Sequence, residues 1–95
     1  MEFEFAGKIF YWRGPSPYHF VAMPLDLAAE LRAVANDVTY GWGVIPATVR
    51  IGATEWRTSL FPKDGGYLVP IKDVVRRAEG LAEGDRPTVR LIVKR

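Results

Sequence analysis

Two short amphipathic strands follow one another in residues 44–61, VIPATVRIGATEWRTSLF. Apolar residues occupy alternate positions in the first, Val44 to Ile51, and again in the second, Thr54 to Phe61. A period of two is typical of a strand with one buried face, and Gly52-Ala53 provides a short link. The centre of the chain therefore predicts two adjoining β-strands.

The residues before this stretch predict two more strands and a helix. Glu2 to Arg13 alternates as one long strand, with Gly7 as a bulge. After a turn-forming Gly-Pro-Ser-Pro segment, Tyr18 to Met23 returns as its hairpin partner. Proline is tolerated in the first turn of a helix, so Pro24 opens a helix that we expect to end near Asn36-Asp37.

The residues after the central strands predict the same kinds of element. A glycine-containing loop, Pro62 to Gly66, leads into a strand over Tyr67 to Ile71. Lys72 to Glu79 predicts a short helix that ends at Gly80. Thr88 to Lys94 alternates as the last strand.

The order ββαβ thus occurs twice, and two local matches indicate an internal duplication. The strand after the first helix contains Thr48-Val49-Arg50-Ile51, and the last strand contains Thr88-Val89-Arg90-Leu91. The first helix is preceded by Met23-Pro24-Leu25, and the second by Val69-Pro70-Ile71. The alternative is that these are unrelated strands using the residue types that strands favour.

Each half has too few strands to bury a face of its own, but two halves can close on each other. We therefore predict a mainly β fold with one domain over residues 1–95 and pseudo-repeats of about 1–52 and 53–95. The domain is expected to be a six-stranded barrel with a pseudo-twofold axis and two short helices, an arrangement that leaves few open sheet edges.

The composition excludes several kinds of chemistry. The 95 residues contain no cysteine and a single histidine, His19, which removes disulfides, thiolate nucleophiles and zinc ribbons. No GxSxG, HExxH or P-loop motif is present, so Ser59 could act as a nucleophile only with His19 beside it. We expect no catalytic residue, no metal and no cofactor, and hence no enzyme. With no basic leader and no long apolar run, we expect a cytoplasmic protein without membrane contact.

The formal net charge of +2 conceals an uneven distribution. Residues 1–48 contain three basic and five acidic side chains, a net charge of −2, whereas residues 49–95 contain ten and six, a net charge of +4. An anionic partner is therefore expected to bind the second half.

A family resemblance extends over nearly the whole chain. The stretches that carry it are Phe5 to Lys8, Phe20 to Pro24, Gly41 to Gly52, Trp56 to Tyr67, Pro70 to Lys72 and Gly84-Asp85. On these residues the chain resembles the bacterial domain-of-unknown-function family nineteen hundred and five. The resemblance implies a double-split β-barrel, an architecture shared with small antitoxin-like and transition-state-regulator DNA-binding proteins that build it from two chains. Some relatives are joined to a segment of the bacteriocin-protection type, and the resemblance implies no particular activity.

The densest polar cluster lies in the basic half. Its members are Thr58, Ser59, Lys63, Tyr67, Lys72, Arg76 and Arg77. Hydroxyls and cations that converge in this way bind phosphate or carboxylate, so we predict a small non-enzymatic domain that binds a small anionic ligand. The loop from Asp37 to Gly43 lengthens the first repeat and adds Tyr40 and Trp42, which we expect to plug the barrel or to stack on the ligand. The alternative is that the cluster is a solvated helix face and a protected strand edge.

Two further functions stay open. A nucleic-acid-binding barrel would use the outward strand arginines Arg50, Arg57 and Arg90, although interleaved acidic residues and the small net charge argue against this. A protein–protein or homo-oligomeric module would use exposed aromatics such as Trp12 and Tyr18. We expect a monomer or a weak homodimer.

Overall fold

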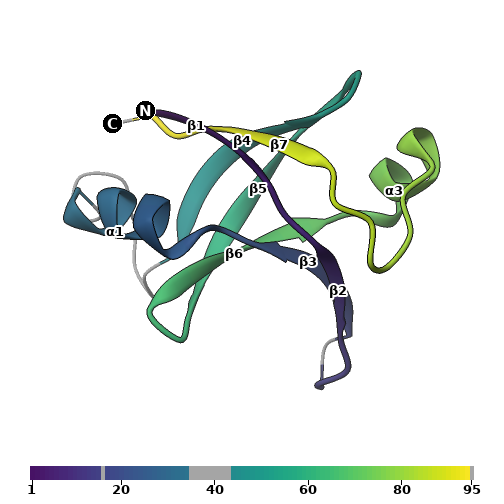
Figure 1. Ribbon diagram of the computed structural model, residues 1–95, viewed down its shortest axis with the longest axis horizontal. Helices are drawn as coiled ribbons and strands as arrows, with labels where there is room; N and C mark the ends of the chain where they lie inside the picture. The colour runs from purple at the N-terminus through teal and green to yellow at the C-terminus, as the bar shows by residue number, and fades with distance from the viewer. Residues whose placement is uncertain (16, 35–43, 95) are drawn as a thin grey trace.

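The computed structural model describes residues 1–15, 17–34 and 44–94 and shows a mainly β fold (Figure 1). Its elements are β1 (Glu2–Ala6), β2 (Ile9–Trp12), β3 (Tyr18–Ala22), α1 (Leu25–Ala33), β4 (Ile45–Ile51), β5 (Thr54–Lys63), β6 (Gly66–Ile71), α3 (Asp73–Glu79) and β7 (Thr88–Ile92). The predicted fold class, mainly β with two short helices, is confirmed for this part of the chain. Neither of these helices is long and apolar enough to cross a membrane.

The strands form one antiparallel sheet in the order β1-β7-β4-β5-β6-β3-β2. Its two outermost strands, β1 and β2, are consecutive in the chain and are separated only by Gly7 and Lys8. The sheet therefore curls into a half-barrel, and the N-terminal segment runs from β7 to β3 (Figure 1). The segment from Glu2 to Arg13, predicted as one strand, is divided in two, so the predicted six strands become seven among the described residues.

The break after β1 has a local cause at Gly7. The amide of Ile9 donates to the carbonyl of Asp85 at 2.9 Å, so the chain here bonds to the loop before β7 instead of to β7 itself. Gly7 is buried, and a Cβ atom at this position would overlap Cγ1 of Val21 on β3. Glycine is therefore required where the chain passes from one part of the sheet to the other.

The strand pairing is unchanged when the two halves of the chain are exchanged. In this exchange β1 and β2 correspond to β5, β3 corresponds to β6, and β4 corresponds to β7. The β1–β7 pair then corresponds to the β4–β5 pair, and the β2–β3 pair corresponds to the β5–β6 pair. Between β4 and β7, Arg50 lies directly opposite Arg90, and these are the matched arginines of the two similar strands. The other sequence match is displaced, because Pro24 is the N-cap of α1 whereas the N-cap of α3 is Lys72, beyond Pro70.

The inward side of the curled sheet holds the hydrophobic core. The largest fully buried side chains include Ile9, Leu31, Ile45, Leu60, Ile71 and Leu91. The helix α1 packs on β6 and buries Ala28 and Leu31, while α3 packs beside β5 and buries Val75. Within the described ranges no polar or charged side chain is buried.

Three predicted boundaries are wrong by two residues or more, one of them being the last strand, which ends at Ile92 and not at Lys94. The helix that begins after Pro24 ends at Ala33 with Val34 as its C-cap, before the predicted end near Asn36-Asp37. The strand β5 continues through Lys63, so the predicted loop over residues 62–66 shrinks to a turn at Asp64 and Gly65, with φ values of 50° and 80°. Positive φ at two successive residues is the geometry of a type I′ turn, which matches the twist of the two strands that it joins.

Candidate functional site

A groove of about 540 Å³ lies on the outer surface over β3, β5 and β6. It is lined by Pro17, Tyr18, Phe20, Arg57, Thr58, Ser59, Phe61, Pro70 and Lys72. Aromatic rings and prolines supply the apolar part of this lining, and two cations and two hydroxyls supply the polar part. We call it the aromatic groove.

Strand alternation explains how the groove acquires its apolar side. On β5, Trp56 and Leu60 point into the core, which leaves Phe61 on the outside with 45% of its surface exposed. The ring of Phe20 on β3 lies perpendicular to the Phe61 ring, with centroids 6.5 Å apart, and 5.7 Å from the Tyr18 ring. Three aromatic rings from two strands that are not hydrogen-bonded to each other therefore meet on one surface.

The same alternation supplies the polar side. Arg57 and Ser59 face outward from β5, and Lys72 follows the end of β6. Neither Arg57 nor Lys72 forms an ion pair with another residue in the described ranges. The contrast is Arg76, whose guanidinium donates to the Asp73 carboxylate at 2.9 Å. Two cations beside an apolar surface are thus available to an external anion.

Tyr18 lies near side chains of both charges. Burial raises the pKa of the Tyr18 phenol, and the negative charge of Asp73 raises it further. The hydrogen bond from Arg76, together with the charges of Arg76, Arg77 and His19, lowers the pKa of Asp73. Tyr18 is therefore a neutral hydrogen-bond donor at the edge of the groove at neutral pH.

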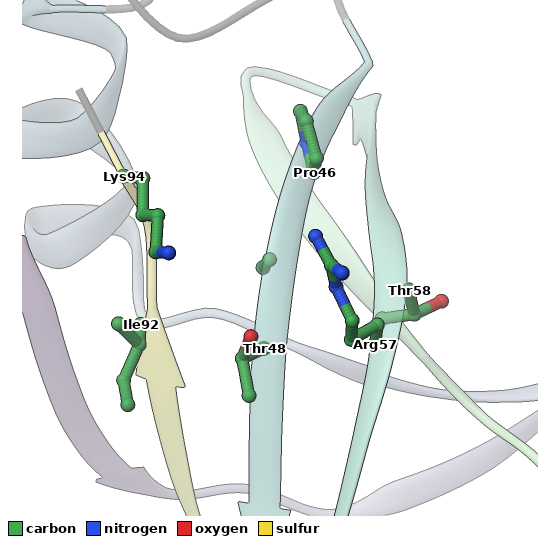
Figure 2. A pocket seen from close by; sticks show the side chains of 7 residues that line it. Pro46, Thr48, Arg57, Thr58, Ile92 and Lys94 are labelled. Atoms are coloured by element: carbon green, nitrogen blue, oxygen red, sulfur yellow. The ribbon is translucent and has the colours of Figure 1, made fainter.

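A second groove, of about 390 Å³, lies over β4, β5 and β7. It is lined by Pro46, Ala47, Thr48, Arg57, Thr58, Ile92 and Lys94. Figure 2 shows Thr48 on β4 between Ile92 on one side and Arg57 on the other, with Lys94 beyond Ile92. Arg57 and Thr58 line both grooves, so the two lie next to each other at these residues. We call this one the polar groove.

Only part of the polar cluster predicted from the sequence lies together in the structure. Thr58, Ser59 and Lys72 line the aromatic groove together. Tyr67 does not join them, because it is only 5% exposed and belongs to the core. Lys63 lies at the end of its hairpin with its Nζ 4.3 Å from the centre of the Trp12 ring.

Other predicted residues lie elsewhere. Arg76 is held by Asp73, as described above, and does not line either groove. Tyr40 and Trp42 lie outside the described residues.

The three strand arginines of the nucleic-acid alternative are not equivalent. Arg90 pairs with two carboxylates of β1, Glu2 at 3.4 Å and Glu4 at 3.1 Å. Arg50 donates through Nε to the Gly52 carbonyl at 3.2 Å. Arg57 alone of the three lines a groove that contains no carboxylate.

The aromatic part of the site was only partly predicted from the sequence. Tyr18 stood out as an exposed aromatic residue, but Phe20 and Phe61 did not. A usable signal was the sequence Tyr18-His19-Phe20-Val21, in which large apolar residues occupy both phases of one strand. Since only one face of that strand points to the core, the other face must present aromatic rings to solvent.

These features define a class of small protein: a curled antiparallel sheet with two short helices and two adjacent grooves on its outer surface. The chain belongs to the family described as Domain of unknown function (DUF1905), whose sequence model matches residues 5–91. The family predicted from the sequence is thereby confirmed. A search of curated proteins gave no match.

Proposed function

We propose that this protein is a small non-enzymatic binding domain whose aromatic groove accepts a flat ligand that carries a phosphate or carboxylate. The observation that supports this most directly is the lining of the groove, in which Tyr18, Phe20 and Phe61 stand beside Arg57 and Lys72. Ligand sites of this kind combine a largely apolar surface with a few polar groups that fix orientation.

Each part of the groove suits one part of such a ligand. A planar ring would stack on or pack edgewise against the exposed Phe61 and Phe20 rings, which are already arranged edge to face. The anionic group would reach the Arg57 guanidinium, whose planar fork suits phosphate and carboxylate, and the hydroxyl of Ser59. No carboxylate of the described residues lines the groove, and the Asp73 carboxylate near Tyr18 is bonded to Arg76.

Adenosine 5′-monophosphate is a suitable first probe, since it has both a planar base and a phosphate. In an amide NMR titration we expect shifts for Tyr18, Phe20, Ser59 and Lys72. Adenosine alone and inorganic phosphate alone should bind more weakly than the intact nucleotide, because each reaches only one side of the groove. Equal responses to all three probes, or shifts confined to other strands, would contradict the proposal.

Two matched arginine variants test the polar contact. Arg57→Gln should weaken nucleotide binding by about tenfold or more, as expected for the loss of a hydrogen bond to a charged group. Arg90→Gln removes the same charge from a neighbouring part of the sheet where the arginine is already paired, and it should leave the affinity unchanged. Equal effects of the two substitutions would show that only net charge matters.

We also infer that β1 and β2 are one strand bent at Gly7, so that the fold is a six-stranded double-split barrel built from the halves 1–52 and 53–95. The exchange of halves that preserves every strand pairing supports this inference, as does the uninterrupted β5, which pairs with β4 and then with β6. The cytoplasm remains our prediction for its location.

A further inference from the structure

We infer that the two grooves together form a track for a single strand of nucleic acid. The inference rests on the proposed function and names its ligand class. In it, a base stacks in the aromatic groove while the phosphates on one side of that base follow the polar groove past Arg57 to Lys94.

The first argument is adjacency. Arg57 and Thr58 line both grooves, so the two grooves are neighbours and one extended ligand could contact both. On the far side, Phe20 and Phe61 also line a third depression, which adds Trp12 and Lys63. Together the three depressions cross strands from β7 to β2, far more than a mononucleotide would cover.

The second argument is charge. The residues that line these three depressions include four cations, Arg57, Lys63, Lys72 and Lys94, and no carboxylate of the described residues, although the Lys63 ammonium lies 4.0 Å from the exposed Asp64 carboxylate. A single anionic group would need only one or two of them. Cations distributed along a groove are the arrangement that follows a phosphate backbone and releases its counterions.

The third argument is the exposure of the rings, which favours a single strand over a duplex. Phe61 is 45% exposed and Trp12 is 37% exposed, so each offers ring surface to solvent. The bases of a duplex are already stacked on each other, whereas the bases of a single strand are free to stack on aromatic side chains. The ammonium of Lys63, 4.3 Å from the Trp12 ring centre, places a cation next to this stacking surface.

The test is the dependence of affinity on length, measured by fluorescence anisotropy with labelled oligothymidylates of two, four and eight nucleotides. We expect affinity to rise by about tenfold or more from the dinucleotide to the octanucleotide and to fall as salt is raised. An octamer duplex should bind more weakly than the single strand. Equal affinity for all lengths, or preference for the duplex, would overturn the inference.

A substitution at Lys94 tests the strand proposal separately from small-ligand binding, because Lys94 lines the polar groove and not the aromatic groove. Lys94→Gln should weaken the octanucleotide by about threefold or more and leave adenosine 5′-monophosphate binding unchanged. The matched control is Lys8→Gln, an exposed lysine between β1 and β2 that lines none of the three depressions, and it should change neither. If Lys94→Gln behaves like Lys8→Gln, the strand does not follow the polar groove and the inference fails.

The outcomes distinguish this inference from the proposed function. Mononucleotide binding without any gain in affinity from length would support the proposed function and contradict the single-strand inference. Octanucleotide binding that depends on Lys94, with no mononucleotide binding, would support the single-strand inference and contradict the proposed small ligand. Failure of both probes would overturn both proposals. A concentration-dependent dimer in ultracentrifugation that Phe61→Ser abolishes would show that a second copy covers the rings, and would also overturn the inference.

Discussion

The outer surface of this sheet has two regions that use the same strand alternation with opposite results. Over β1, β7 and β4, which we call the paired face, Arg90 is held by Glu2 and Glu4 of the neighbouring strand. Over β5, β6, β3 and β2, which we call the aromatic face, the outward residues include Phe20 and Phe61, and the Arg57 beside them forms no ion pair with another described residue. In the first region the outward cation Arg90 is paired within the molecule, whereas in the second Phe61 and Arg57 are exposed to solvent.

This difference shows why charge counted along the chain misleads. Residues 49–95 have a net charge of +4, but their Arg90 is compensated by glutamates from residues 1–48, because β1 lies next to β7. What determines available positive charge is the neighbouring strand rather than the half of the chain. Arg57 stays available because its direct neighbour on β4 is Thr48, a neutral residue.

The substitution with the largest expected effect is at Gly7, where the chain passes between the paired face and the aromatic face. Gly7→Ala would place a methyl group against Cγ1 of Val21, and overpacking of this kind costs about 1–3 kcal/mol. We expect a lower free energy of unfolding in urea denaturation. The amide of Ile9, which donates to the Asp85 carbonyl, should exchange its hydrogen faster.

A double variant identifies the cause. Val21→Ala removes the atom that the new methyl group meets and leaves a small cavity of its own. The two substitutions combined should therefore cost less than the sum of the two single effects. Additive effects would show that the contact with Val21 is not the reason that glycine is needed.

Much of the fold was predictable because it depends on local alternation. Five of the seven strands lie within the predicted segments, β5 and β6 extend theirs by two residues and one, and both helices start within one residue of their predicted first positions. The irregularity at Gly7 was predicted as a bulge, but the division into two strands was not, since it depends on hydrogen bonds from Gly7 to Pro87 and from Ile9 to Asp85, far away in the sequence. The early end of α1 was missed as well, because Val34 continues the apolar pattern although it is the C-cap.

The site was less predictable, because it depends on which strands lie side by side. Thr58, Ser59 and Lys72 could be grouped, since they share one hairpin and the residue after it. Tyr67 was included as a polar residue, but its ring is buried in the core. Phe20 and Phe61 come from different halves of the chain, and only the sheet order brings them to one surface.

A smaller effect is expected from releasing Arg90 on the paired face. The double variant Glu2→Gln and Glu4→Gln removes both of its partners, whose side chains are 60% and 58% exposed. Exposed ion pairs contribute little, so the free energy of unfolding should fall by about 1 kcal/mol or less, and less at high salt. The freed cation should raise octathymidylate affinity by about twofold. No change in affinity would mean that the strand does not come near Arg90.

The smallest effect concerns Tyr18, which lies at the edge of the aromatic face. Burial first, and then the charge of Asp73, raise its pKa above the usual value of about 10, so the folded protein keeps the phenol proton when the unfolded chain has lost it. Stability from this group is therefore complete below about pH 10 and is lost as the pH rises through the folded pKa. Tyr18→Phe should make the free energy of unfolding fall less steeply above pH 10. In a phenolate absorbance titration, Asp73→Asn should lower the Tyr18 pKa only in part, because burial is the larger cause. A return to the usual value would instead make the charge of Asp73 the dominant cause.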